Sequence, residues 1–341
     1  MERSLFDAGL SFVELGGVSP NPKISLVRKG VALCRREGLD FVLAVGGGSV
    51  IDSAKAIAMG AATGRDPWEF ASTGTRPDKT LPVATVLTLA ASGSETSNSC
   101  VLTNEETKEK RGITSETNRP VISFLDPENT FTVSKFQTGC GIVDIMMHTL
   151  ERYLTPEGGE SDLTDRIAEG LLIATRDAGR RAIADPRDYE ARATLMWAGS
   201  VSHNDYTGCG RKRLFPVHKL EHELSAFRDE IAHGAGLSVL FPAWAEHEMP
   251  YDYPRFAQFA NRVLGVEMDF EHPERTAREG IRTLRRFFEE IGMPTHLSQL
   301  GIKPENYEKL AANTVRTVNG PVKSYSPLDE KAIIEIYRLA E

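Results

Sequence analysis

Apolar and polar residues follow different patterns in the two halves of the chain. Over residues 1–135, short apolar runs rich in β-branched residues alternate with stretches of helical periodicity. The runs that predict strands are SFVELGG (11–17), FVLAVGGG (41–48), PVATVLT (82–88) and VISFLD (121–126). Most are apolar throughout, which predicts a parallel sheet with helices on both faces. The alternation indicates βαβ units and therefore an α/β domain.

Residues 136–341 have the spacing of amphipathic helices and almost no strand signals. The helical segments are SDLTDRIAEGLLIATRDAGRRAIADP, DYEARATLMWAGSVSHND, HPERTAREGIRTLRRFFEEIG, PENYEKLAANTVRT and LDEKAIIEIYRLAE. Several begin at Ser, Asp or Pro and end at Gly or Pro, as capped helices do. A chain of 341 residues favours two cores. We therefore expect an α/β domain at 1–135 and a helical domain at 136–341.

Composition and charge narrow the class of protein. The chain is 40% hydrophobic and 26% charged, with a formal net charge of −8, which argues against nucleic acid or anionic membranes as main partners. Its four cysteines form no CxxC pair, as expected in a reducing compartment. No apolar run approaches the roughly 18–20 residues of a membrane span. We expect a cytoplasmic protein that binds no nucleic acid and no membrane.

A glycine-rich turn follows the second predicted strand. The segment FVLAVGGGSVIDSAKAIA reads as a strand, three glycines, Ser49 and then a helix. Backbone N–H groups at such a helix start can hold a phosphate. The turn lacks both GxGxxG spacing and the Walker lysine, and alone it is structural about as often as it binds a ligand. Its place at the carboxyl end of a parallel strand favours ligand binding.

Two later segments could also face that edge of the sheet. The stretch LAASGSETSNS after the third strand offers hydroxyls and free N–H groups, and TKEKRG offers Lys108 and Lys110. A capped loop and a solvated charge run are the alternative interpretation, which we prefer for Lys108.

An acid and a histidine lie four residues apart within the apolar segment GIVDIMMHTLERY (141–153). In a helix this spacing puts Asp144 and His148 on one face. A buried carboxylate without a partner is unfavourable. The partner could be the imidazolium of His148 or a metal ion.

Three of the eight histidines fall within sixteen residues, at His218, His222 and His233. A carboxylate with three imidazoles suits Fe(II) or Zn(II) with one position open for substrate. The segment HELSAF is not the HExxH motif of zinc proteases, because residue 226 is Ala. Spacing alone does not join this cluster to Asp144.

Five segments together resemble a known family: GGGSVIDSAKAIA, TLAASGSET, LDPENTFTV, GIVDIMMHTLERY, and HKLEHELSA with a following HG. They resemble the iron-containing (group III) alcohol dehydrogenases, in particular the NAD(P)H-dependent butanol dehydrogenase branch, over nearly the whole chain. The resemblance implies a dehydroquinate-synthase-like fold, with a parallel-sheet dinucleotide-binding domain followed by a helical metal-binding domain and the active site between them.

The resemblance also implies roles for individual residues. The metal, Fe(II) with Zn(II) as the other possibility, would be bound by Asp144, His148, His218 and His233, and His222 would be the catalytic proton relay. The cofactor, NAD or NADP, would be bound by Asn21, Gly47, Gly48, Ser49, Asp52, Thr88, Ser92, Lys110 and Thr132. For Asp52 the alternative is a helix-start residue with no ligand contact. The implied reaction transfers a hydride between NAD(P)H and a small aldehyde or primary alcohol. A homo-oligomer is expected, as in relatives.

Some segments depart from the family pattern. The resemblance implies that members begin with a further strand-and-helix unit that carries another glycine-rich turn, and we expect this N-terminal segment to be absent here. Ser92 and Ser97 replace larger polar residues, the loop FRDEIAH is one residue longer than usual, and RKRLFP (211–216) replaces the usual approach to His218.

Two alternatives stay open. One keeps the fold but has the activity of a dehydroquinate synthase or glycerol dehydrogenase, for which Arg211, Lys212 and Arg213 would be a hint of phosphate binding. The other is a truncated metal-binding homologue without turnover.

Overall fold

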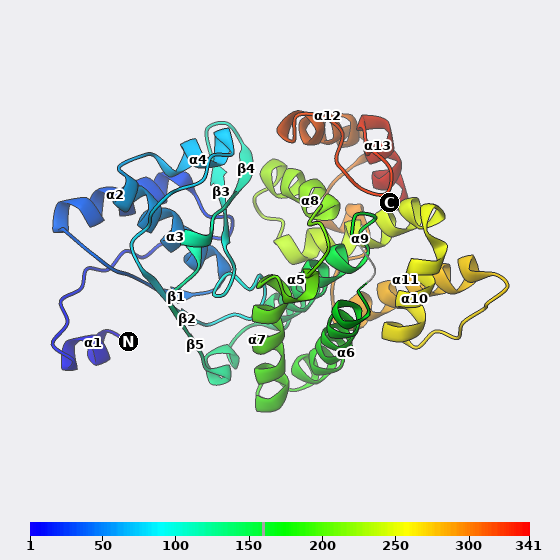
Figure 1. Cartoon of the computed structure of the whole chain (residues 1–341), viewed down its shortest axis with the longest axis horizontal. Coiled ribbons are helices and arrows are strands. Elements are labelled where there is room, and N and C mark those ends of the chain that lie inside the picture. Colours follow the sequence, from blue (N-terminus) through cyan, green and yellow to red (C-terminus); the bar gives the residue numbers. More distant parts are fainter. Residues whose placement is uncertain (159–160) are drawn as a thin grey trace.

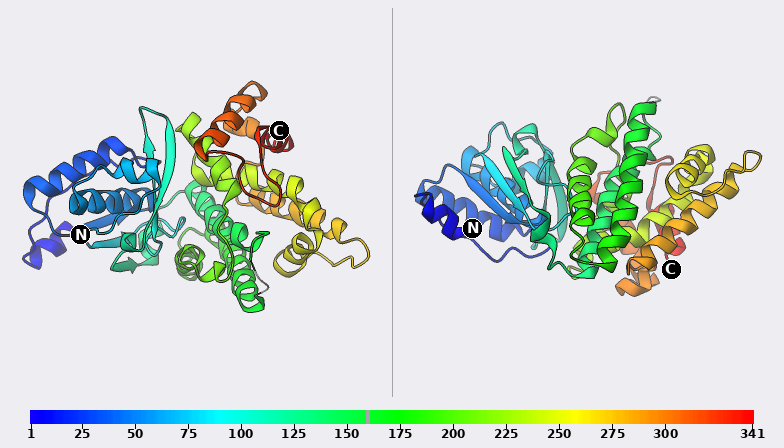
Figure 2. Two further views of the ribbon diagram at one scale, coloured as in Figure 1. Left: turned by 45° about the horizontal axis from the view of Figure 1, so that its top comes forward. Right: turned by 90° about the horizontal axis from the view of Figure 1, so that it is seen from below.

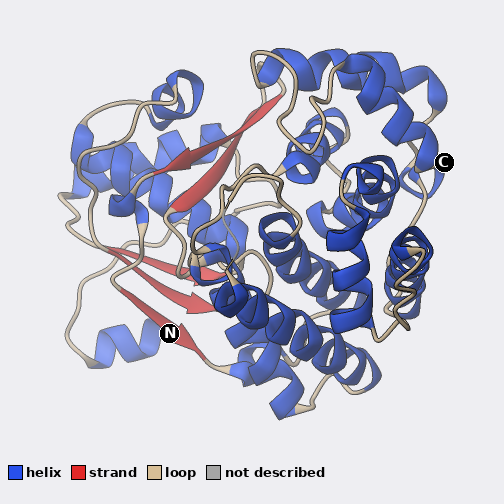
Figure 3. Cartoon of the chain, turned by 45° about the vertical axis from the view of Figure 1, so that its right-hand side comes forward, coloured by secondary structure: helices blue, strands red, loops and turns tan. Residues whose placement is uncertain are grey.

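The α/β half of the chain contains a small parallel sheet. The structure, a computed structural model, describes residues 1–158 and 161–341. The three strands lie in the order β1 (Val42–Gly46), β2 (Val83–Leu87) and β5 (Ile122–Leu125), and Figure 3 shows their arrows running in one direction. The antiparallel hairpin of β3 (Ser99–Asn104) and β4 (Glu109–Thr114) reaches from this domain toward the helical half (Figure 1).

Helices cover one face of this sheet. The helix α3 (Gly48–Thr63) packs on β1 and β2, because Ile51, Ala54 and Ala58 meet the inward side chains of both strands in one apolar cluster. The sheet domain also contains the helices α1 (Glu2–Asp7), α2 (Ile24–Glu37) and α4 (Pro67–Thr73), and 3-10 turns at Glu116–Asn118 and Pro127–Thr130.

Two expectations for this domain are wrong. Residues 11–17 form no strand and pair with none of the described strands, and Phe12 and Val13 are exposed. The face of the sheet opposite α3 is also open: Val45, Ile122 and Phe124 are 44%, 50% and 52% exposed. Continuous apolarity therefore does not show here that both faces are covered.

The described residues from 136 on are mainly helical, as predicted. The helices are α5 (Lys135–Tyr153), α6 (Asp162–Ala184), α7 (Tyr189–His203), α8 (Pro216–Phe227), α9 (His233–Glu248), α10 (Tyr253–Leu264), α11 (Pro273–Glu290), α12 (Tyr307–Thr317) and α13 (Glu330–Leu339). Short 3-10 turns connect them at Tyr206–Gly208, Met249–Tyr251, Leu297–Leu300 and Pro304–Asn306. None of the described helices is both long and apolar enough to cross a membrane.

The helix α5 lies at the centre of the helical half and is buried from Thr138 to its end at Tyr153. It contacts α6, α7 and α9, and one large apolar cluster runs through these helices. Both views in Figure 2 place the two halves side by side, and α7 and α8 contact the sheet domain, α7 at Pro127–Thr130 and α8 at β4. The boundary expected at 135/136 falls at the first residue of α5.

Candidate metal and cofactor site

A cleft of about 1080 Å³ lies between the two halves of the molecule. Its sheet-domain wall includes the glycine turn, the serine-rich segment 92–99 and β4, and its helical wall includes α5, α8 and the start of α9. The wall of the sheet domain is thus the carboxyl edge of the parallel strands, where open α/β sheets bind ligands. Both predicted clusters face this one cleft.

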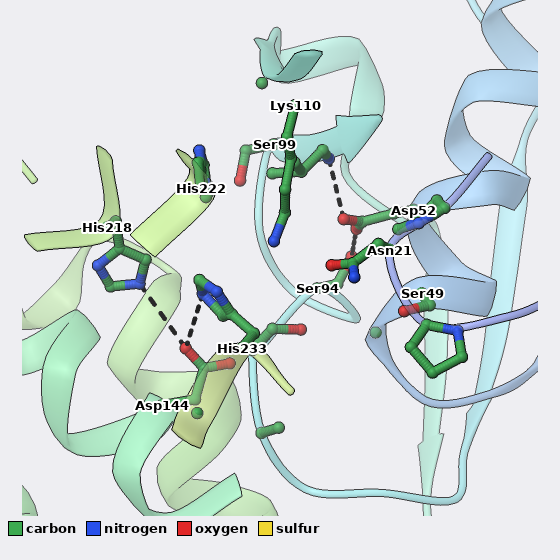
Figure 4. A pocket seen from close by; sticks show the side chains of 18 of the residues that line it. Asn21, Ser49, Asp52, Ser94, Ser99, Lys110, Asp144, His218, His222 and His233 are labelled. Atoms are coloured by element: carbon green, nitrogen blue, oxygen red, sulfur yellow. Dashed lines mark hydrogen bonds and ion pairs between the residues drawn. The ribbon is translucent and has the colours of Figure 1, made fainter. Parts of the chain in front are cut away.

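Four side chains from three helices converge on one wall. Asp144 and His148 come from α5, His218 from α8 and His233 from the first position of α9. The Asp144 Oδ1 atom lies 3.4 Å from His148 Nδ1 and 3.7 Å from Nε2 of both His218 and His233. Figure 4 shows His218 and His233 pointing at this carboxylate.

The chemistry of these atoms fits a divalent metal ion. Asp144 Oδ1, His148 Nδ1 and His218 Nε2 are buried without a hydrogen-bond partner, which is unfavourable unless another group satisfies them. Two atoms that each bind a tetrahedral ion at about 2.1 Å are about 3.4 Å apart. Ligand atoms of Asp144, His218 and His233 all lie within 4.8 Å of one another, and His148 adjoins this set through Asp144.

Two fully buried glutamates, which the sequence analysis missed, stand behind the histidines. Glu151 accepts a hydrogen bond from Nδ1 of His218, and Glu221 accepts one from Nδ1 of His233. Burial alone would lower the pKa of His218, but the Glu151 and Asp144 carboxylates raise it to about 9. Glu221 lies within the predicted histidine cluster, directly before His222, so the sequence gave a weak indication that it belongs to the site. The pair of Glu151 and His218 spans 67 positions and gave none.

His222 and His203 also line the cleft. Burial and the Lys110 ammonium hold the pKa of His222 well below its ordinary value, so its ring is neutral at pH 7. The ring of His203 lies 4.0 Å from that of His148, between centroids, and its Nδ1 meets the Ser92 carbonyl at 2.8 Å. His203 was not predicted, because nothing in its local sequence separates it from other helix-terminal histidines.

The glycine turn is confirmed as a helix start. The helix α3 begins at Gly48, directly after β1, so the first N–H groups of α3 have no partner within the helix. A Cβ atom on Gly48 would lie 2.3 Å from the Ser92 hydroxyl. A side chain at this position would therefore displace the Ser92 hydroxyl.

A buried lysine of α3 holds the serine-rich segment in place. The Lys55 ammonium is fully buried and donates to the carbonyls of Ser94, Ser97 and Ser99 at 2.6, 3.0 and 2.8 Å. Asp52 accepts bonds from the Ser94 hydroxyl and from the Val101 N–H at 2.9 Å. Both Asp52 oxygens are therefore used within the protein, which favours an anchoring role for this residue.

Most of the predicted cofactor residues lie at the cleft. Those that line it are Asn21, Gly47, Gly48, Ser49, Asp52, Ser92 and Lys110. Thr88 and Thr132 are not among the lining residues, and Thr132 is exposed. Asn21 has a left-handed backbone (φ 57°) and donates through its amide to Asp229, in the loop before α9, at 3.2 Å.

The basic stretch 211–213 is engaged by carboxylates. Arg211 pairs with Asp165 and Lys212 with Glu157, and Arg213 pairs with Asp205 at 2.8 Å. Only Arg213 of the three lines the cleft, so this stretch offers little support for a phosphate-binding synthase.

Family models account for almost the whole chain. Residues 1–127 match the model for iron-containing alcohol dehydrogenases, and residues 138–340 match the C-terminal model of the Fe-containing alcohol dehydrogenase family. The chain belongs to the iron-containing alcohol dehydrogenase family. The sequence-based predictions of family, fold class and enzyme class are thereby confirmed.

Relatives of this iron-containing alcohol dehydrogenase family member include characterised enzymes. It is 40% identical to NADH-dependent butanol dehydrogenase A of Clostridium acetobutylicum over 98% of this chain and 85% of the relative. It is 35% identical to the NADPH-dependent aldehyde reductase YqhD of Escherichia coli over 86% of this chain and 76% of that one. The crystal structure of NADH-dependent butanol dehydrogenase A from Thermotoga maritima superposes with a TM-score of 0.94 at 36% identity, over 99% of this chain and 86% of the other.

Proposed function

We propose that this protein reduces small aldehydes to primary alcohols with NADH or NADPH, and catalyses the reverse oxidation. Aldehyde, reduced cofactor and one proton give alcohol and oxidised cofactor. When bound, the cofactor supplies the hydride and a divalent metal, Fe(II) or Zn(II), supplies Lewis acidity at the carbonyl oxygen. The names of the relatives support both the substrate class and the two cofactor types.

The observation that carries this proposal is the set of buried, unpartnered ligand atoms beside the glycine turn in one cleft. Asp144, His148, His218 and His233 would hold the metal ion. The free N–H groups at Gly48 and Ser49 would bind the cofactor pyrophosphate, and Asn21, Ser92 and Lys110 would position the rest of the cofactor.

His222 would move the proton. Its neutral ring can accept a proton on one nitrogen and release one from the other. The residue lines the cleft beside His233, with 5.7 Å between ring centroids. We also propose that the protein works as a homo-oligomer.

The test is the loss of NADH or NADPH absorbance with butyraldehyde, after loading the purified chain with Fe(II) or Zn(II). We expect turnover in the loaded protein and loss of turnover on chelation. In Asp144→Ala the turnover rate should drop by about 10³-fold or more, because this variant lacks the carboxylate ligand of the predicted metal set. Asp177→Ala, at an exposed position of α6, is the matched control and should keep full activity. Unchanged turnover after chelation and in Asp144→Ala would contradict the proposal.

A further inference from the structure

The two glutamates behind the metal-site histidines differ in what else they contact. Glu151, on α5, also accepts the backbone N–H of Val217 at 2.6 Å, so both of its partners among the described residues belong to α8. Glu221 also accepts the Ser225 hydroxyl, and its Oε2 lies 3.5 Å from the Lys110 ammonium. Glu221 therefore has a partner in the other domain, and Glu151 has none among the described residues.

Lys110 brings the cofactor wall of the cleft to Glu221. It lies on β4, which packs on α8, and its side chain is only 6% exposed. Figure 4 shows it extending between the histidines and the side of the cleft that carries Asn21 and Asp52. One Glu221 oxygen thus meets both the Lys110 ammonium and the Nδ1 atom of His233.

This arrangement is not a second metal site, although ligand atoms of Glu221, His222 and His233 lie within 4.8 Å of one another. The Glu221 oxygen already contacts His233 and an ammonium group, and a second cation beside that ammonium would be repelled. Glu221 therefore contacts the predicted metal site through the ring of His233.

A carboxylate bonded to Nδ1 of a histidine fixes its tautomer and directs Nε2 at the metal. Nε2 of His233 does face Asp144, at 3.7 Å. If a cofactor orders Lys110, the same contact orders Glu221 and then His233. Coupling of two ligands through one ordered element is reciprocal, so each ligand raises the affinity of the other by the same factor.

We propose that Glu221 is a positioning residue that links Lys110 to His233, so that a nicotinamide dinucleotide and the metal ion bind cooperatively. This inference rests on the proposed function, since it takes both ligands from there. Glu151 accepts a hydrogen bond from Nδ1 of His218, as Glu221 does from Nδ1 of His233, but it has no described contact with the sheet domain. Glu151 is therefore the matched control.

The experiment measures binding in the full chain. The dissociation constant of Zn(II) is determined by competition with a chromophoric chelator, with and without saturating NADH, and the visible spectrum of bound Co(II) is recorded under both conditions. For the unaltered protein we expect NADH to tighten Zn(II) binding by about fivefold or more and to shift the Co(II) spectrum.

The variants separate positioning from coupling. Glu221→Gln and Glu151→Gln should each weaken Zn(II) binding by about 10–100-fold. NADH should still tighten Zn(II) binding in Glu151→Gln but should have no effect on it in Glu221→Gln. In Lys110→Met, which leaves Glu221 and His233 in place, NADH should also have no effect on Zn(II) binding, measured at an NADH concentration that a fluorescence titration shows to saturate this variant.

The proposal is overturned if NADH leaves Zn(II) affinity unchanged in the unaltered protein, if Glu221→Gln keeps the coupling, or if Glu151→Gln loses it. Failure of the proposed function would look different, because the unaltered protein would then bind no NADH or would not turn over butyraldehyde. Circular dichroism of each variant checks that the fold is kept.

Discussion

The two walls of the cleft are held in place by different means. On the helical wall the ligand side chains project from helices that share one apolar cluster. Behind them, Glu151 is hydrogen-bonded to His218 and Glu221 to His233. On the other wall the sheet is small and open on one face, and the segment 94–99 is anchored by one buried lysine.

This difference teaches that packing fixes the metal ligands and polar anchoring fixes the cofactor loop. Helices meet over broad apolar faces, so a ligand on one helix cannot move without disturbing the core. A loop has no such face, and it takes one position only when its carbonyl groups are satisfied. The predictions below test each kind of support, from the largest expected effect to the smallest.

The largest expected loss of stability comes from truncating an aromatic residue in the core of the helical half. Phe256 is fully buried, with its ring centroid 6.0 Å from that of Trp244 and 5.6 Å from that of Tyr325. We expect Phe256→Ala to lower the free energy of unfolding by about 3–5 kcal/mol, because it leaves a cavity. Urea unfolding followed by circular dichroism measures the loss.

The matched variant is Phe124→Ala on the open face of the sheet, where the side chain is 52% exposed. It should lower the free energy of unfolding by less than about 1 kcal/mol, since little apolar surface is removed from contact. Equal losses in the two variants would contradict the comparison and would indicate that another surface covers this face in solution.

Removing the buried ammonium should loosen the cofactor wall alone. Lys55→Met leaves three carbonyl groups and Asp52 without their cation, so we expect a loss of about 3 kcal/mol in unfolding free energy. NADH binding, followed by cofactor fluorescence, should weaken by about tenfold or more, which corresponds to about 1.4 kcal/mol or more of lost positioning. Zn(II) affinity should stay unchanged.

The control for this variant is Lys29→Met, at an exposed position of α2. It should alter neither stability nor NADH affinity. A loss of Zn(II) affinity in Lys55→Met equal to the loss of NADH affinity would show that the two walls are not separately supported.

Adding a methyl group where α5 and α9 meet should lower the free energy of unfolding by less than the loss of the Lys55 ammonium does. In Gly234→Ala the new Cβ would lie 2.2 Å from the Cys140 carbonyl oxygen and 2.6 Å from the Cys140 Cα atom. The two helices must separate, so we expect a loss of about 1–3 kcal/mol and weaker Zn(II) binding, because Gly234 adjoins His233.

Gly170→Ala, in the same half of the molecule, should change the free energy of unfolding in the opposite direction to Gly234→Ala. Gly170 lies in α6, and a Cβ atom there would have no heavy atom of the described neighbouring residues within 4 Å, so alanine should raise the free energy of unfolding by about 0.5–1 kcal/mol. If thermal denaturation shows the same change in Gly170→Ala and Gly234→Ala, helix contact is not what distinguishes the two glycines.

Local patterns predicted much of the fold. The helical segments, the strands at 41–48, 82–88 and 121–126 and the helix start after the glycine turn are confirmed, because their periodicity and caps are properties of a few neighbouring residues. The strand expected at 11–17 is wrong. A strand needs hydrogen bonds to a neighbouring strand, and no pattern within residues 11–17 reports whether another strand pairs with it.

The sequence by itself determined which residues could bind a metal and which turn could receive a phosphate, because spacing places Asp144 and His148 on one helix face and glycines at a strand end. Only the tertiary structure decided which of these groups meet. Glu151 reaches His218, and Glu221 is shared by His233 and Lys110, through the packing of elements that are remote in the chain. Such contacts depend on how helices and strands are oriented against one another, which no single segment encodes.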